Sequence, residues 1–266
     1  MMSPSIITGQ MPDKLFWNMK SMLTILVFLY FSNVLSQMED GPITYISGSA
    51  GATTNGISFV PNFSLEQPAA IFNLTLERGR FSFEPEFTFS LEEGRAWYQV
   101  YWLRYKLLNE GKFRLRTGGH LGLNFAKILD EGNDEVIKAE RYLVGELAPS
   151  YKLTINSTVG LQYMIARGYD IQTRDIQHFL MLNANFSNIK ISESLFFEIS
   201  PQVFYLATFG PGEGYYVAST IKLSKSNFPL SLSSLINTNI STDIPGKDFL
   251  WNLTLTYSFN KAITYK

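Results

Sequence analysis

The sequence predicts an all-β fold, a closed antiparallel up-and-down transmembrane β-barrel of about twelve strands, preceded by a cleaved signal peptide. Three observations predict this fold class. Long stretches alternate between apolar and polar residues with period two, which is the pattern of strands with one apolar face. Beyond residue 36, no stretch approaches the roughly 18 apolar residues of a transmembrane helix. The connections between the alternating stretches are short and long in turn.

The N-terminal segment has the composition of a secretory signal. Lys20 places a positive charge before residues 22–31, which are apolar apart from one threonine. This run is too short to span roughly 30 Å of hydrocarbon, so the alternative of a membrane anchor is disfavoured. Val34 and Ser36 fit the −3 and −1 positions of a signal-peptidase site. We therefore expect cleavage before Gln37.

The chain accordingly divides into two predicted parts. Residues 1–36 are the signal peptide, and residues 37–266 are the transmembrane β-barrel domain. Residues 1–18 lack signal character, and Met19 or Met22 is an alternative translation start.

Twelve alternating stretches follow. In one of them Phe81 and Phe83 share an apolar face, whereas Ser82 and Glu84 share a polar face. A tilted transmembrane strand needs about 9–11 residues, which each stretch can supply. The predicted strands are 43–51, 69–77, 80–92, 96–108, 112–126, 140–153, 158–168, 176–187, 194–208, 214–225, 229–237 and 248–259.

The connections define two different ends of the predicted barrel. Residues 127–139, 169–175 and 238–247 are expected to form loops at one end, whereas 154–157 is a tight turn at the other. Both termini fall on the short-turn side, as in outer-membrane barrels. Region 52–68 is open to three interpretations: a further strand, a continuation of the first strand, or part of the first outer loop.

Three prolines interrupt the strand pattern. Pro85, Pro149 and Pro201 each lack the N–H that a strand donates to its neighbour. We expect a local β-bulge at each, with a bend that shapes the lumen as the functional alternative.

The polar faces predict a charged lumen. Glycine-containing turns at 78–79, 93–95 and 109–111 set a register in which Glu84 and Arg104 are cross-strand neighbours. The predicted lumen-lining residues are Glu84, Glu86, Trp102, Arg104, Lys106, Arg114, Arg116, His120, Glu146, Glu198 and Lys222.

The apolar faces favour a membrane barrel over a soluble two-sheet sandwich. A sandwich also alternates, but its apolar faces point at each other. Here the polar faces carry mid-strand charges, and the apolar faces are aromatic near both strand ends, as in membrane barrels with two aromatic girdles. The expected girdles are Trp97, Tyr142, Tyr205, Tyr215 and Trp251 at the loop end, and Phe81, Tyr151, Phe186, Tyr257 and Phe259 at the turn end.

The signal segment, the alternating strands and the last run from Trp251 to Phe259 resemble small outer-membrane β-barrel (porin-like) proteins of Gram-negative bacteria. The resemblance implies location in the cell outer membrane, with outer-membrane lipid and the barrel-assembly machinery as partners. It also implies that Trp251, Tyr257 and Phe259 form the barrel-insertion signal. The tail 260–266 departs from the pattern, which usually ends at the terminal aromatic residue; Tyr265 is an alternative terminal aromatic.

The sequence contains few residues suited to catalysis or metal binding. The chain has no Cys and two His, so we expect no metal, cofactor or catalytic site. Outer-membrane phospholipases carry His and Ser two residues apart on a lipid-facing strand, and neither His120 nor His178 has Ser at that spacing. His178 is expected to face outward. A net charge of −1 argues against a nucleic-acid partner.

These observations predict a passive or weakly selective channel for a small hydrophilic solute, which passes through the charge-lined lumen. The competing interpretation is that the charges pair and side chains fill the lumen. A structural or surface-interaction barrel without transport, using the three long loops, is the alternative function. An outer-membrane lipid-modifying enzyme is less favoured, because neither histidine has a serine two residues away. The sequence does not indicate an oligomeric state.

Overall fold

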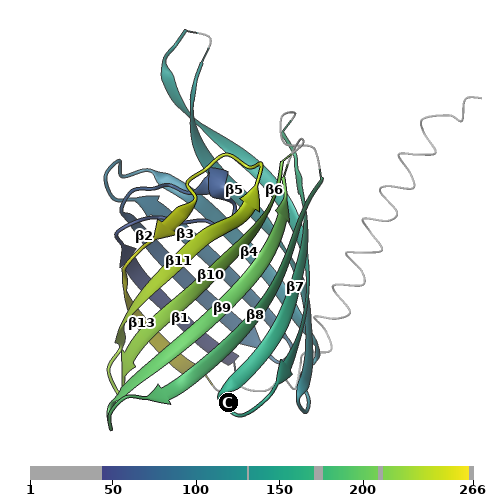
Figure 1. Cartoon of the computed structure of the whole chain (residues 1–266), viewed down its shortest axis with the longest axis vertical. Helices are drawn as coiled ribbons and strands as arrows, with labels where there is room; N and C mark the ends of the chain where they lie inside the picture. The colour runs from purple at the N-terminus through teal and green to yellow at the C-terminus, as the bar shows by residue number, and fades with distance from the viewer. Residues whose placement is uncertain (1–43, 131, 171–175, 209–211, 264–266) are drawn as a thin grey trace, which may run out of the picture. The chain divides into compact units, whose positions relative to one another are not determined.

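The computed structural model describes residues 44–263 except 131, 171–175 and 209–211. Within these residues the strands form one closed antiparallel barrel, in which successive strands are neighbours and the first pairs with the last (Figure 1). The strands are β1 (Thr44–Thr53), β2 (Ala69–Arg78), β3 (Phe81–Ser90), β4 (Ala96–Leu108), β5 (Phe113–Leu129), β6 (Glu135–Lys152), β7 (Ser157–Gly168), β8 (Ile176–Lys190), β9 (Leu195–Ala207), β10 (Glu213–Lys225), β11 (Leu230–Thr242), β12 (Phe249–Trp251) and β13 (Thr254–Ile263).

The predicted twelve-stranded closed barrel is confirmed, with one extra short strand. The strands β12 and β13 both pair with β11 and together occupy the twelfth position. The Asn252 side chain bridges the break between them, since its Oδ1 accepts a hydrogen bond from the Leu235 amide at 2.9 Å. The predicted signal peptide and its cleavage before Gln37 lie outside the described residues.

The outer wall of the barrel is apolar and exposed. Leu103, Leu143 and Leu182 are each more than half exposed, although they lie in the middle of long strands. A contiguous apolar surface of this kind is unfavourable in water and suits a hydrocarbon environment. No helix of the described residues is long and apolar enough to cross a membrane.

Two of the predicted girdle residues do not belong to a girdle. Trp97 and Tyr142 are 3% and 6% exposed, because the segment between β1 and β2 covers them. The Trp97 indole Nε1 donates to the Phe63 carbonyl at 2.7 Å, and the Tyr142 ring packs on Phe63. Tyr142 also has the same parity as Glu146 in β6, so both side chains point inward. Their strand-end positions alone were a misleading signal.

The prediction of bulges at the three prolines is wrong. Pro85, Pro149 and Pro201 stay in continuous register with Tyr101, Leu115 and Ser219 on one neighbouring strand. With the other neighbouring strand, pairing is interrupted at each proline and resumes beyond it in the same register. A missing N–H therefore costs local pairing on one side only, because the second strand still holds the proline in place. The register shifts that do occur lie elsewhere, at Phe87/Phe89, Lys106/Leu108, Phe186/Ile189 and Tyr215/Tyr216.

Part of the predicted loop 127–139 is instead a β-hairpin. The strands β5 and β6 pair as far as Leu129 and Glu135, and this hairpin rises above the other strands (Figure 1). Lys127 forms ion pairs with Glu135 at 3.3 Å and with Glu93 at 2.7 Å, and the latter lowers the pKa of the Glu93 carboxyl. Cross-strand pairing therefore stabilises strands outside the barrel wall, where sequence suggests a loop. Similarly, β11 continues to Thr242, so the first half of the predicted loop 238–247 is a strand.

The closed ladder predicts heat-modifiable migration on gels. Every strand except the three-residue β12 has two paired neighbours, so the barrel wall offers no long open edge where detergent-induced unfolding would start. We expect unboiled protein in dodecyl sulfate to migrate differently from boiled protein. Identical migration before and after boiling would contradict closure.

Candidate functional site: the barrel interior

The first loop folds into the barrel rather than away from it. Loop 54–68, named here the inner loop, contains the short helix η1 (Pro61–Phe63). The Phe59 ring packs 5.5 Å from Phe204 and 6.2 Å from Phe179, two inward side chains of β9 and β8. Residues 52–53 thus continue the first strand, which is the second interpretation of the sequence, and residues 54–68 form the first loop, which is the third.

Several polar contacts hold the inner loop in place. The Gly56 amide donates to the Gln67 carbonyl at 2.8 Å, so the two ends of the loop are bonded to each other. A Cβ on Gly56 would lie 2.8 Å from the Trp97 ring, which explains the glycine. Lys247 reaches Glu66 at 2.5 Å from the neighbouring outer connection. The loop is therefore an ordered part of the interior.

Aromatic side chains fill the interior around the inner loop. The Phe204 and Tyr216 rings are stacked at 4.9 Å, and both residues are almost fully buried. Together with Phe179, Leu206 and Ile244 they form the buried apolar core of this barrel. Side chains thus occupy much of the lumen, as the competing interpretation of the sequence states.

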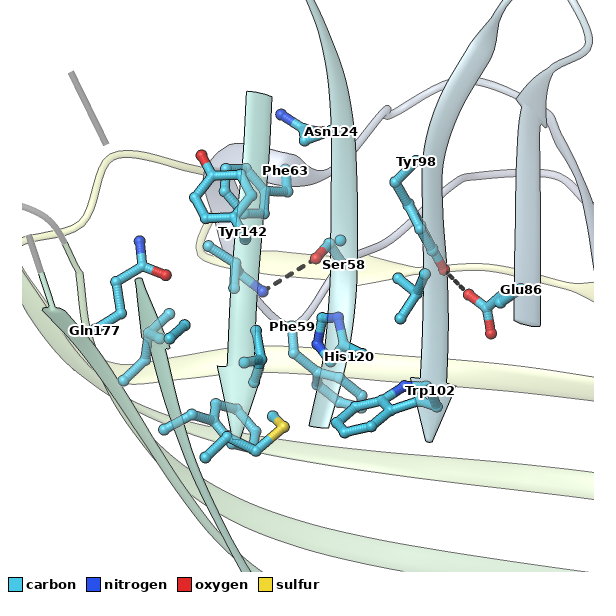
Figure 2. A pocket seen from close by; sticks show the side chains of 18 of the residues that line it. Ser58, Phe59, Phe63, Glu86, Tyr98, Trp102, His120, Asn124, Tyr142 and Gln177 are labelled. Carbon is cyan, nitrogen blue, oxygen red and sulfur yellow. Dashed lines mark hydrogen bonds between the residues drawn. The ribbon is translucent and has the colours of Figure 1, made fainter. Parts of the chain in front are cut away.

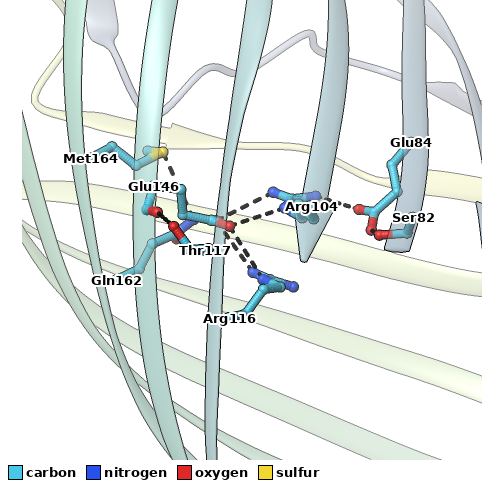
Figure 3. A network of polar contacts seen from close by, with 8 residues as sticks. All are labelled: Ser82, Glu84, Arg104, Arg116, Thr117, Glu146, Gln162 and Met164. Atoms are coloured by element: carbon cyan, nitrogen blue, oxygen red, sulfur yellow. Dashed lines mark hydrogen bonds and ion pairs between the residues drawn. The ribbon is translucent and has the colours of Figure 1, made fainter. Parts of the chain in front are cut away.

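Below the aromatic core, a network of ion pairs centres on Glu146 (Figure 3). The Glu146 side chain is fully buried and contacts Arg104 at 3.1 Å and Arg116 at 3.2 Å. The Gln162 amide donates to the same carboxylate at 2.6 Å, and Arg104 also pairs with Glu84. The four strands β3 to β6 thus share one continuous belt of paired charges, to which β7 adds Gln162.

The pairing of Glu84 with Arg104 is diagonal, because the predicted register is wrong by two residues. Glu84 lies opposite Trp102, and Arg104 lies opposite Ser82 and Gly118. The β3–β4 connection is longer than expected, and bulges beside it and beside the β4–β5 turn shift the strands. A shift of two keeps every side chain on its face, so the long Arg104 side chain still reaches Glu84.

A cavity of about 460 Å³ lies between the inner loop and this belt (Figure 2). Trp102 and His120 form its floor, with their rings 4.1 Å apart. The Glu86 carboxylate accepts a hydrogen bond from the Tyr98 hydroxyl at the wall. Most of the remaining wall is apolar.

A second cavity of about 240 Å³ lies near the turn end. Its lining includes three of the predicted luminal cations, Lys106, Arg114 and Arg116. Lys106 pairs with Glu77 of β2, a luminal anion that is not among the residues predicted from the sequence. The lumen is therefore basic at the turn end and largely apolar nearer the inner loop.

The comparisons with known proteins concern the barrel. No protein-family model and no curated protein matches the sequence. The KdgM porin in complex with disordered oligogalacturonate matches with a TM-score of 0.51 and 11% identity, over 81% of this chain and 99% of that chain. A second KdgM porin structure matches with a TM-score of 0.51 and 11% identity, over 80% and 99% of the two chains. The chain has a porin fold.

The remaining predicted luminal residues of this porin-like barrel lie on the wall formed by β9 and β10. Glu198 and Lys222 are directly opposite each other on the two strands. Asn185 of β8 donates to Glu198 at 2.8 Å and to Ser200 at 2.8 Å. Glu198 and Lys222 therefore lie on neighbouring strands of the wall, rather than facing each other across the lumen.

The two histidines have separate environments. His178 hydrogen-bonds the Tyr163 hydroxyl at 2.8 Å on the outer face, as expected, whereas His120 packs on Trp102 inside. No group of three His, Asp or Glu residues in the described part of the chain is placed to hold a metal ion. Trp251, Tyr257 and Phe259 are about half exposed on the outer face, and their role as an insertion signal stays a prediction.

Proposed function

We propose that the chain is an outer-membrane channel for small hydrophilic solutes, with passage restricted by the inner loop. The single observation that carries this proposal is the closed barrel wall with charged and polar side chains inside and apolar side chains outside. A barrel that served only as an anchor would not require eleven predicted charged, aromatic and imidazole side chains on its inner wall. The porin fold supports a channel at the level of architecture.

Planar lipid bilayers provide the direct test. The purified barrel is expected to give discrete, voltage-independent conductance steps of small amplitude, because the inner loop narrows the lumen. Absence of steps in the wild type and also in a variant with a shortened inner loop would contradict the proposal. Activity of the shortened variant alone would mean that the native inner loop closes the channel.

Selectivity should depend on the cations at the turn end. Changing Lys106→Gln and Arg114→Gln together removes two positive charges from the second cavity, whereas the Glu146 network keeps its partners. We expect the reversal potential in a salt gradient to shift toward cation preference. As a control, Leu103→Ile and Leu143→Ile change two outward-facing side chains of β4 and β6 without changing charge, and they should not shift the potential. An unchanged potential in the luminal variant would show that these residues do not line the conducting path.

A surface-interaction barrel is the second candidate function. The β5–β6 hairpin favours it, since Leu129 and Ile137 are 66% and 53% exposed near its tip. Removing residues 128–136 and closing the hairpin should leave conductance unchanged if the barrel is a channel. Loss of cell-surface adhesion with an unchanged or absent conductance would favour the surface-interaction function.

A further inference from the structure

We propose that the cavity beneath the inner loop binds a small neutral molecule with an aromatic or aliphatic body and one hydrogen-bonding group. This inference goes beyond solute passage and does not depend on it, because a barrel that does not conduct would bind the same molecule. The cavity is lined by residues from β3 to β9 together with the inner loop (Figure 2).

The size and lining of the cavity define the body of the ligand. Its volume of about 460 Å³ lies within the roughly 300–1,000 Å³ of small-molecule sites. The Trp102, Phe59 and Phe179 rings and the Val144 and Met164 side chains contribute its apolar walls. Apolar walls with several aromatic rings favour a flat or compact apolar body over a sugar, whose hydroxyl groups would lose hydrogen bonds to water.

One side chain supplies the polar contact. Gln177 lines the cavity and is 7% exposed, yet its amide makes no hydrogen bond within the described part of the chain. An amide offers both a donor and an acceptor, so a ligand hydroxyl can bind it in either sense. Because this amide faces the cavity without a protein partner among the described residues, it is free to bond a ligand there.

The charges around the cavity disfavour an anionic ligand. Glu86 is the acidic group of the lining, and Tyr98 already donates to it. An anion would meet this carboxylate, and the arginines of the belt are engaged by Glu84 and Glu146. Burial of an anion without a free counter-ion is costly, so a neutral ligand is favoured over an anion.

Fluorine NMR on the purified full-length barrel tests the site with two matched probes, 4-fluorophenol and fluorobenzene. Saturable binding of both is expected, in addition to the linear uptake of each probe by detergent. Gln177→Met keeps the side-chain volume and removes the hydrogen bond, so 4-fluorophenol should bind about fivefold more weakly while fluorobenzene is unaffected. The control Ile176→Met lies on the outer face of the same strand and should change neither.

A second pair of variants tests occupancy. Ala166 lies opposite Gln177 on β7, and Ala166→Trp should fill the cavity and abolish saturable binding of both probes. Ile165→Trp, on the outer face, should retain binding and reports whether a tryptophan in β7 is tolerated. Absence of saturable binding to the wild type, binding that survives Ala166→Trp, or tighter binding of 4-fluorobenzoate would each overturn the proposal. Conductance measured on the same samples tests the channel separately.

Discussion

Shortening the inner loop should raise the single-channel conductance severalfold. Residues 57–66 can be replaced by two glycines, because Gly56 and Gln67 are already hydrogen-bonded to each other at 2.8 Å and β1 and β2 pair up to Thr53 and Ala69. The replacement removes Phe59 and Phe63 from the lumen, and with them the aromatic contacts that narrow the path between the loop end and the belt. Planar-bilayer recordings at fixed salt and voltage measure the change.

The matched control shortens an outer connection that does not enter the lumen. Removing residues 131–133 between β5 and β6 shortens the chain at the loop end but leaves the inner loop in place. The control should conduct as the wild type does. Equal conductance of the inner-loop variant and the wild type would mean that the narrowest point lies at the charged belt instead.

Replacing Glu146 should cause the largest loss of stability of any single luminal substitution in the belt. Glu146→Ala leaves Arg104 and Arg116 without the fully buried carboxylate that both contact. Breaking a buried ion pair typically costs about 3–5 kcal/mol, and we expect about 3 kcal/mol because Arg104 keeps Glu84 and Arg116 is 42% exposed. Urea unfolding in lipid vesicles, followed by tryptophan fluorescence, measures the free energy of unfolding.

A triple variant separates the ion pairs from the packing. Arg104→Met, Arg116→Met and Glu146→Met together remove all three charges, and Glu84 keeps its hydrogen bond from Ser82. This variant should be more stable than Glu146→Ala, because the one charge that loses its ionic partner, Glu84, is partly exposed and keeps the Ser82 hydrogen bond. Glu92→Gln, in an exposed turn, should have no effect. A triple variant less stable than Glu146→Ala would show that packing, not charge pairing, explains the loss.

Strand positions were predictable because alternation is a local property. Alternate residues of a strand share a face, so the apolar face of each strand identifies the opposite face as luminal. This alternation placed Glu84, Glu146 and Lys222 inside without knowledge of their partners. Parity would also have placed Tyr142 inside, since it is four residues from Glu146. The prediction that Tyr142 belongs to the outer girdle, made from its position near a strand end, is wrong.

Register and the interior were not predictable in the same way. A two-residue difference in a connection changes every partner but no face, which is why Glu84 was assigned the right contact through the wrong pairing. The position of the inner loop depends on contacts such as Phe59 with Phe179, which are far apart in the sequence. Nothing local in residues 54–68 distinguishes a loop that folds inward from one that extends outward.

The closure of the barrel also determines when its interior is completed. The strand β1 pairs with β13 over the whole of its length, and Asn55 contacts Trp251 and Asn252 at the start of the inner loop. These contacts join residues separated by almost the entire chain, so they carry the highest loop-closure entropy of any in the barrel. The inner loop can reach β8 and β9 only once those strands have curved round to enclose it. Joining the first strand to the last and packing the lumen therefore belong to the same late stage of folding.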